Sequence, residues 1–350
     1  MSKKLIGFTC AYTPLAIISA GGFRPYRIFS NNNELPEQAG QILHENLCPH
    51  VKLVLDRAMA GDIPDEMGGV IFMNSCDTMR RLSDAWSVVR PQDKTLQLDL
   101  PLCADKLSID FFAQELVRLS EFLASWGGSQ ITEETIRESI CRYNSFADDL
   151  SKARLLLKQG KLKGGSVALQ KLYISGATEP LEIAHEKLST LLNALVPDNP
   201  QNKKKIFLVG NVMPLPEFFS FFESCGVQII AEDMCTGSRM FPHIPITADG
   251  ADIFHQLAKG ILSQQPCART FCPDQVGSFA NDVVTQAKQS GADAVIVHTM
   301  KFCDPYLARL PSVRSAMKEA EIPMLFLEGD CSLRSMGQHK TRIEAFVETL

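Results

Sequence analysis

The sequence predicts an α/β protein with two Rossmann- or flavodoxin-like parallel-sheet domains and a helical segment between them. Short apolar strands alternate with helices near both ends of the 350-residue chain, which is typical of parallel sheets covered by helices. Between these regions the sequence has helical periodicity and no clear strand. We therefore expect an N-terminal α/β domain over 1–105, a helical segment over 106–202 and a C-terminal α/β domain over 203–350.

The N-terminal region is expected to form strands joined by helices. The expected strands are Lys4–Thr9, Arg24–Phe29, Val70–Asn74 and Leu96–Asp99. The expected helices are Pro14–Ala20, His44–Met59 and a basic helix that includes Met79–Leu82. The middle region contributes only helices, as in "FFAQELVRLSEFLASW", with one start at Thr132 and a closing linker over Pro197–Asn202.

Strand–helix alternation resumes after the linker. The expected strands are Lys205–Val209, Val227–Ala231, Ala294–His298 and Met324–Leu327. The expected helices are Pro216–Cys225, Ala251–Gln264, Ser278–Ser290, Ser312–Ala320 and Arg342–Leu350. Both α/β regions open with strand, proline loop, helix, glycine turn and strand, in "IGFTCAYTPLAIISAGGFRPYRIF" and "IFLVGNVMPLPEFFSFFESCGVQIIAED". We interpret this shared order as a repeated unit.

The composition is that of an ordinary globular protein with a large core. Hydrophobic residues make up 45% and charged residues 21%, and the formal net charge is −5. This mild acidity argues against wholesale binding to nucleic acid or to anionic membranes. The N-terminus lacks the features of a secretory signal, and no apolar run approaches the ~18 residues of a membrane span. We therefore expect a cytoplasmic protein.

The cysteine content is unusual for that compartment. The chain has 11 cysteines, and disulfides are rare in the cytosol, so metal binding or redox chemistry becomes the better explanation. A single cysteine is equally well explained as a small core residue. Five cysteines follow expected strands: Cys10, Cys76, Cys235, Cys303 and Cys331. Because parallel strands end at one edge of a sheet, where ligands bind, we expect distant thiols to meet there.

The helix after each of these strands is expected to favour a thiolate. Its N-terminus has unpaired N–H groups and a partial positive charge, and both lower the pKa of a thiol. In "NSCDTMRRL", Ser75, Asp77 or Thr78 is expected to cap the helix, and Arg80 and Arg81 add positive charge.

The spacing of the cysteines favours a cluster assembled from distant loops. The sequence has no C-x-x-C pair and no ferredoxin-type run, and its closest cysteines are Cys267 and Cys272. Soft sulfur ligands favour an iron–sulfur cluster or zinc. Three alternatives therefore stay open for these cysteines: ligands of an iron–sulfur cluster, ligands of zinc, and buried or redox-active thiols. The glycine motifs of nucleotide sites are absent. We expect His298 in the core, whereas two roles stay open for His50: a helix cap or a site residue.

Several segments resemble one known family. They are "GFTCAYTPLAIISAGGFRPYRI", "NLCPHVK", "NSCDTMRRL", "GADAVIVHTMKFCDPY", "IPMLFLEGD" and "KTRIEAFVE". On these segments the chain resembles the D-component family of 2-hydroxyacyl-CoA dehydratases, whose superfamily also contains benzoyl-CoA reductase subunits and double-cubane cluster proteins. The resemblance covers most of the chain, although the middle helical region contributes little, and it implies the same two-domain fold.

The resemblance also implies a 4Fe-4S cluster held between the domains by three cysteines. Cys48, Cys76 and Cys303 match those family positions. Three protein ligands leave one iron open, and the family's dehydratases bind the thioester carbonyl of an acyl-CoA there. By the same resemblance, a separate ATP-dependent activator supplies the electron that reduces the bound thioester. The protein orients the substrate at the cluster and provides a dry cavity.

The remaining cysteines fall into two groups. Cys10, Cys235 and Cys267 stand in the motif-like settings "GFTCAYTP", "EDMCTGSR" and "QPCART". With the first three they would suffice for a double-cubane cluster, as in the double-cubane members of the superfamily. The cysteines that we expect to be structural are Cys103, Cys141, Cys225, Cys272 and Cys331.

Three functions follow as alternatives. The first is the iron–sulfur subunit of an oxygen-sensitive radical 2-hydroxyacyl-CoA dehydratase or benzoyl-CoA reductase-like enzyme, a lyase or oxidoreductase acting on an acyl-CoA. The second is a double-cubane 8Fe-9S protein that reduces small molecules with an ATP-driven reductase partner. The third is a non-enzymatic metal- or cluster-binding protein. We expect the first, in a homo- or heterodimer with a homologous subunit, and no catalytic acid or base is evident in the sequence.

Overall fold

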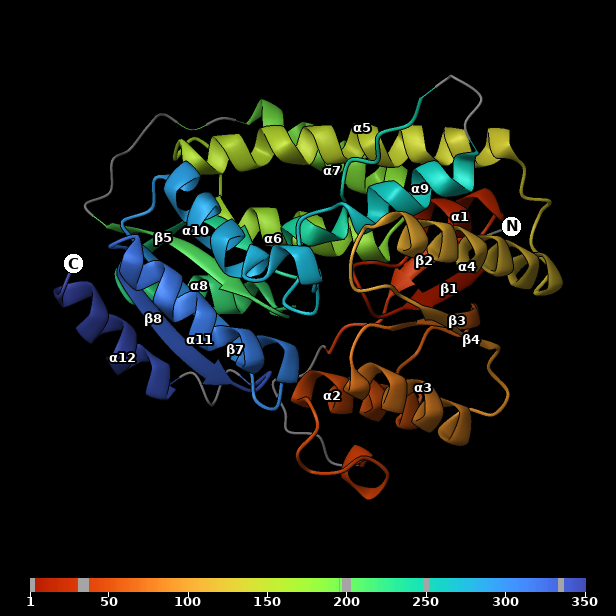
Figure 1. Cartoon of the computed structure of the whole chain (residues 1–350), viewed down its shortest axis with the longest axis horizontal. Coiled ribbons are helices and arrows are strands. Elements are labelled where there is room, and N and C mark those ends of the chain that lie inside the picture. Colours follow the sequence, from red (N-terminus) through yellow and green to blue (C-terminus); the bar gives the residue numbers. More distant parts are fainter. Residues whose placement is uncertain (1–3, 31–37, 195, 197–202, 248–251, 333–336) are drawn as a thin grey trace.

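Two parallel β-sheets form the frame of the molecule (Figure 1). The computed structural model describes residues 4–30, 38–194, 196, 203–247, 252–332 and 337–350. Over these residues the first sheet has the order β2-β1-β3-β4 and the second β6-β5-β7-β8, with all neighbouring strands parallel. This confirms the predicted fold class. Both orders match the start of the flavodoxin-like order 2-1-3-4-5.

The first sheet comes from the N-terminal part of the chain. Its strands are β1 (Leu5–Phe8), β2 (Arg24–Arg27), β3 (Met67–Asn74) and β4 (Thr95–Asp99). Its helices are α1 (Leu15–Ala20), α2 (Pro49–Met59) and α3 (Asp77–Val89), with a 3₁₀ turn η1 (Ala39–Gln41). Residues 70–73 of β3 are all buried, as expected for a central strand covered on both faces.

The second sheet comes from the C-terminal part. Its strands are β5 (Lys204–Gly210), β6 (Val227–Asp233), β7 (Ala294–Met300) and β8 (Met324–Gly329). Its helices are α8 (Pro216–Ser224), α9 (Ile253–Leu262), α10 (Ser278–Ser290), α11 (Asp304–Glu319) and α12 (Gly337–Glu348), with 3₁₀ turns η2 (Ser238–Met240) and η3 (Pro273–Gln275). The units β1-α1-β2 and β5-α8-β6 occupy equivalent places, which agrees with a repeated unit.

Among the described residues between β4 and β5, four helices join the two sheets. They are α4 (Lys106–Ser125), α5 (Glu133–Lys158), α6 (Gly165–Thr178) and α7 (Leu181–Asn193). Figure 1 shows α5 running along both sheets, and it contacts α1 at one end of the molecule and β6 at the other. One hydrophobic core includes Ile6 of β1, Phe146 of α5 and Leu257 of α9. The helical layer therefore fixes one sheet relative to the other.

Three predicted helix starts and one predicted helix cap required correction. The last helix, expected over Arg342–Leu350, spans Gly337–Glu348. The helix expected from His44 begins at Pro49, because Cys48 is its N-cap residue and proline occupies the first turn. The helix expected from Ser312 begins at Asp304 and continues through Pro311. Cys76 is itself the N-cap residue of α3, and no side chain caps that helix.

One predicted helix start is confirmed, and two predicted segments lie wholly or partly outside the described residues. Thr132 is the N-cap of α5 and forms a reciprocal capping box with Thr135, as its position had indicated. The linker predicted over 197–202 lies outside the described residues, as does the first residue of the helix predicted over 251–264.

Gly210 at the end of β5 provides a test of how tightly the second sheet is packed. A Cβ atom there would lie 2.1 Å from the backbone oxygen of His298, so Gly210→Ala should lower the free energy of unfolding by at least ~2 kcal/mol. Gly40→Ala is the control, because nothing lies within 4 Å of its Cβ position. Chemical denaturation of both variants is the measurement, and equal midpoints would contradict the packing described.

Candidate active site

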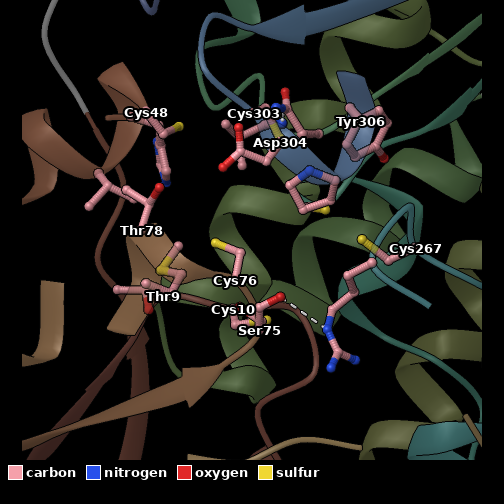
Figure 2. A pocket seen from close by; sticks show the side chains of 18 of the residues that line it. Thr9, Cys10, Cys48, Ser75, Cys76, Thr78, Cys267, Cys303, Asp304 and Tyr306 are labelled. Carbon is pink, nitrogen blue, oxygen red and sulfur yellow. Dashed lines mark hydrogen bonds between the residues drawn. The ribbon is translucent and has the colours of Figure 1, made fainter. Parts of the chain in front are cut away.

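One cavity of about 430 Å³ lies between the loops that follow the strands of both sheets. Its lining contains six of the chain's 11 cysteines. They are Cys10, Cys48, Cys76, Cys235, Cys267 and Cys303. These are the six cysteines named above as candidate cluster ligands, and Figure 2 labels all of them except Cys235. The structure therefore brings together every cysteine of both candidate sets.

The sheet topology explains why the cavity lies here. Strand order reverses between β1 and β3 in the first sheet and between β5 and β7 in the second, and such switch points open a crevice beyond the carboxyl ends of the strands. Cys10 and Cys76 follow β1 and β3, whereas Asn211 and Cys303 follow β5 and β7. The two crevices thus share one cavity.

Cys48, Cys76 and Cys303 occupy equivalent local positions. Each is the N-cap residue of a helix, of α2, α3 and α11 respectively. The unpaired N–H groups and the positive dipole end of three helices therefore lie near one another, which favours an anionic group between them. Phe302, directly before Cys303, has a positive φ of 59°, a strained conformation for a residue other than glycine.

Burial nevertheless dominates the ionisation of these three thiols. Burial raises the pKa of all three thiols above the ordinary value for cysteine. The pKa of Cys48 is raised well above that value, that of Cys303 is raised, and that of Cys76 is raised to about 12. Repulsion adds to this, because Cys48 faces both Cys303 and Cys76. Thiolates therefore need a cation between them, and metal binding releases thiol protons in such a site.

The second set of cysteines lies beside the first. The Cys235 thiol donates a hydrogen bond to the Cys267 sulfur, which raises the pKa of Cys235 and lowers that of Cys267. Burial raises the pKa of Cys10, and charge repulsion from Cys235 contributes. Cys76 is repelled by Cys10, and Cys303 by Cys235. The two sets therefore border each other within one cavity.

Arg27 is a buried cation in the cavity wall. The residue is 1% exposed, and its guanidinium donates to the backbone oxygens of Cys235, at 2.5 Å, and Thr9, at 3.2 Å. Its Nε has no partner in the part of the chain that the structure describes. Burial lowers the pKa of Arg27 to about 10, while Cys235 and Cys10 act in the opposite direction. In the described part of the chain, the ionisable groups that act on Arg27 are Cys235 and Cys10.

A second arginine reaches the sulfur of Cys235. Arg239 is 2% exposed and forms an ion pair of 2.6 Å with Asp233. It also donates to the Tyr306 hydroxyl at 2.5 Å and to Cys235 Sγ at 3.5 Å. This network holds the loop after β6 against α11.

Arg269, in the C-terminal part of the chain, binds to loops of the first sheet at the edge of the cavity. Its guanidinium donates to the backbone oxygens of Ser75 at 3.0 Å, Pro101 at 2.8 Å and Leu100 at 2.7 Å, and the Ser75 bond is drawn in Figure 2. The Tyr12 hydroxyl accepts from the backbone N–H of Cys267 at 3.3 Å. These contacts hold the Cys267 loop of the C-terminal part against the first sheet.

His50, whose role the sequence left open, lines the cavity. It lies in the first turn of α2, is 1% exposed, and its Nδ1 is 2.7 Å from Ser30 Oγ. Burial and the neighbouring Arg27 lower the pKa of His50 to about 3, so the ring is neutral. His298 is fully buried on β7, as the sequence predicted.

The other five cysteines do not contribute to the cavity lining. Cys141 is exposed on α5, and Cys225 is buried after α8. Cys103 donates to Asp105, and Cys331 is buried with its thiol 3.5 Å from Met300 Sδ. Cys272 precedes the turn η3. The structural roles expected for these five cysteines stay predictions.

The thiols do not form a site for a single metal ion. Among the described residues, no three His, Cys, Asp or Glu side chains are placed to hold one ion. Thiolates around one zinc ion stand about 3.8 Å apart, whereas ligands of a cubane stand roughly 6–7 Å apart because each binds a different iron. The alternative of a mononuclear zinc site therefore has no support in the described part of the chain.

Sequence reasoning missed the polar residues that surround the cysteines. Arg27, Arg239, Asn211, Tyr12 and Tyr306 line the cavity or contact its cysteines. A signal existed only for Arg27, because it lies within a short expected strand where a charged residue is unusual.

Fold and site together define a class: a two-sheet α/β protein with a cysteine-lined cavity at the carboxyl ends of its strands. Residues 10–350 match the family described as 2-hydroxyglutaryl-CoA dehydratase, D-component. The chain belongs to this family, and the identification made from the sequence is confirmed. No helix among the described residues is long and apolar enough to cross a membrane.

Curated relatives are similar over most of their length. The (R)-phenyllactyl-CoA dehydratase beta subunit of Clostridium sporogenes is 22% identical, covering 99% of this chain and 92% of that protein. The (R)-2-hydroxyglutaryl-CoA dehydratase beta subunit of Acidaminococcus fermentans is 24% identical over 99% and 93%. One of the benzoyl-CoA reductase subunits of Thauera aromatica is 23% identical over 93% and 85%. The relatives are enzyme subunits, which supports an enzymatic role and not the non-enzymatic alternative.

Glu232 holds the loop that carries Cys235 and titrates near neutral pH. It is 8% exposed and accepts hydrogen bonds from the backbone N–H groups of Met234 at 3.0 Å and Ser238 at 2.8 Å. Burial, with repulsion from Asp233, raises the pKa of Glu232 to about 7. The folded protein therefore binds a proton that the unfolded chain releases near the ordinary value of 4.5.

The free energy of unfolding should consequently fall as pH rises from about 4.5 through about 7, by up to about 3 kcal/mol between pH 4 and 8 from this group. Glu232→Gln should flatten that dependence, because the amide does not ionise. Glu121→Gln, at an exposed site on α4, should leave the slope unchanged. Urea unfolding across this pH range is the measurement, and identical slopes in wild type and Glu232→Gln would refute the assignment.

Proposed function

We propose that the chain is the iron–sulfur subunit of an oxygen-sensitive, ATP-activated reductase in which six cysteines hold a double-cubane 8Fe-9S cluster and a small molecule is reduced. The observation that carries this proposal is the convergence of all six candidate cysteines on one cavity. One set of three would suffice for a single cubane, whereas a double cubane gives a ligand role to all six. Thiolate ligands are those that iron–sulfur clusters require.

The charges around the cavity fit an anionic group of this kind. Arg27 is buried with no carboxylate partner among the described residues, and Cys235 and Cys10 are the charges that act on it. A buried unpaired charge is strongly unfavourable, so ionised sulfur ligands would satisfy Arg27 as well as the metal. The N-termini of α2, α3 and α11 add further positive potential.

In this proposal the bound cluster supplies low-potential electrons and Lewis acidity. Cys48, Cys76 and Cys303 would hold one half, and Cys10, Cys235 and Cys267 the other. Arg27 and Arg239 would stabilise negative charge on the sulfur ligands. Arg269 would hold the loops of the C-terminal part at a fixed distance from the loops of the first sheet.

The chain would depend on other proteins for energy and assembly. It has no P-loop motif, so an ATP-dependent activator or reductase protein would deliver the electrons. Its relatives are named as subunits, and we propose a homo- or heterodimer with a homologous subunit in the cytoplasm.

The names of the relatives favour a second candidate function. They are subunits of 2-hydroxyacyl-CoA dehydratases and of benzoyl-CoA reductase. In this candidate Cys48, Cys76 and Cys303 alone would hold a 4Fe-4S cluster, and an acyl-CoA thioester would occupy the rest of the cavity. Cys10, Cys235 and Cys267 would then line the substrate space as thiols.

Metal analysis distinguishes the two functions. We expect anaerobically purified protein to contain roughly eight irons per chain, against roughly four for one cubane. Cys76→Ala and Cys235→Ala should both lower iron content and visible absorbance, whereas Cys141→Ala should change neither, because Cys141 is exposed on α5. Full iron content in Cys235→Ala with loss in Cys76→Ala would favour the acyl-CoA candidate. Equal loss in all three variants would contradict both.

Arg27→Gln tests the charge argument. Loss of a buried positive charge beside the sulfur ligands should make reduction harder, and we expect the midpoint potential to fall by on the order of 60 mV, which is tenfold for a one-electron couple. Arg24→Gln on the same strand is the control, because that guanidinium donates to the backbone of Thr178 outside the cavity. Anaerobic redox titration of variants with full iron content is the measurement. An unchanged potential in Arg27→Gln would refute the role.

A further inference from the structure

Asn211 carries a buried amide in the lining of the cavity. It directly follows β5 and is 6% exposed. The two sheets have the same strand order, so β5 and β7 of the second sheet correspond to β1 and β3 of the first. Cys10 and Cys76 follow β1 and β3, whereas Asn211 and Cys303 follow β5 and β7. Asn211 therefore has the place in the second sheet that a cysteine has in the first.

The contacts of the Asn211 amide determine its orientation. Its Oδ1 accepts hydrogen bonds from the backbone N–H groups of Val212 at 2.7 Å and Met300 at 3.2 Å. Backbone N–H groups can only donate, so the amide oxygen has to lie on this side and the amide nitrogen on the other. Nδ2 donates one of its two protons to Thr299 Oγ1 at 3.2 Å. The second N–H bond of the amide is left for a further acceptor.

The Cys303 sulfur is that acceptor. A turn after β7 brings Cys303 back toward the end of the strand, because the Cys303 N–H donates to the backbone oxygen of Met300 at 3.3 Å. Asn211 holds the N–H of the same Met300. Burial raises the pKa of the Cys303 thiol, and a hydrogen bond from the Asn211 side chain acts against this. In the first sheet, burial raises the pKa of Cys76, and repulsion from Cys10 adds to it.

A donor placed at a ligand sulfur affects the metal group that the sulfur holds. An N–H group directed at a thiolate stabilises the negative charge and fixes the direction of the side chain. Hydrogen bonds to the sulfurs are among the determinants of the reduction potential of an iron–sulfur cluster. Because an amide does not ionise, Asn211 would supply this effect without changing its own charge.

We propose that Asn211 is a positioning residue that donates an N–H···S hydrogen bond to Cys303 and thereby makes the cluster held by that cysteine easier to reduce. Asn211 would act on the reaction only through Cys303. This inference rests on the proposed function, because it requires Cys303 to be a cluster ligand. It applies to both candidate functions, since Cys303 is a ligand in each.

The hydrogen bond is tested first, by pulsed EPR of reduced holoprotein labelled with ¹⁵N in the side-chain amide of asparagine. Spin density on the Cys303 sulfur should give a ¹⁵N coupling through the N–H···S bond, and Asn211 is the one asparagine among the described residues that line the cavity. Asn211→Leu should abolish the coupling. Asn144→Leu is the matched control, because the Asn144 amide binds the backbone of Ile244 outside the cavity lining. Wild-type holoprotein without the coupling would overturn the proposal.

The midpoint potential is tested second, by anaerobic redox titration of variants with full iron content. Asn211→Leu should make reduction about tenfold less favourable, a fall of about 59 mV for a one-electron couple, because the sulfur loses the donor that stabilises its charge. Asn144→Leu should leave the potential unchanged. An unchanged potential in Asn211→Leu, or the same fall in both variants, would overturn the proposal.

Iron analysis of the same samples separates this inference from the proposed function. Wild-type protein with full iron but without the ¹⁵N coupling refutes the role of Asn211 and leaves the proposed function in place. Wild-type protein without iron refutes the proposed function, and the role of Asn211 falls with it. If Asn211→Leu does not retain its iron, the coupling in the wild-type protein decides alone, since that measurement needs no variant.

Discussion

The constraint on which the site depends is the burial, in one cavity, of thiols and of an arginine that has no carboxylate partner among the described residues. Burial raises the pKa of Cys48 and Cys76 and lowers that of Arg27, so each group alone would be driven toward its neutral form. Sulfur anions and the guanidinium stabilise each other only if they are held side by side. The surrounding structure therefore has to supply fixed geometry, and it does so largely through backbone groups.

That geometry follows from two repeated features of the fold. Parallel strands deliver their following loops to one edge of each sheet, and in three cases the next helix begins directly after the cysteine. A helix N-terminus needs an acceptor for its free N–H groups, and here no side chain provides one at Cys48, Cys76 or Cys303. The three helices thus leave hydrogen-bonding capacity directed at the space that the thiols enclose.

The sequence was sufficient for the sheets and for part of the site. Apolar runs and their order predicted all eight strands of the described chain, and strand ends identified Cys10, Cys76, Cys235 and Cys303 because a strand's carboxyl end is a local feature. Cys48 follows no strand, and Cys267 follows a helix, so only the family resemblance indicated them. Arg27 was missed because its role arises from burial between distant segments. Such burial is a property of the tertiary structure, and its one local sign was a charged residue within a short expected strand.

The helical layer explains how a cavity shared by two separate sheets keeps a constant width. Cys267 reaches the cavity from the loop after α9, and α9 packs against α4 of the intervening helical segment. Arg269, two residues later, donates to three backbone oxygens of the first sheet's loops. Since α5 contacts both α1 and β6, a shift of either sheet would break packing far from the cavity as well as these hydrogen bonds. Each set of three cysteines has members from both parts of the chain, so the spacing of thiols within a set depends on how the helical layer fixes one sheet relative to the other.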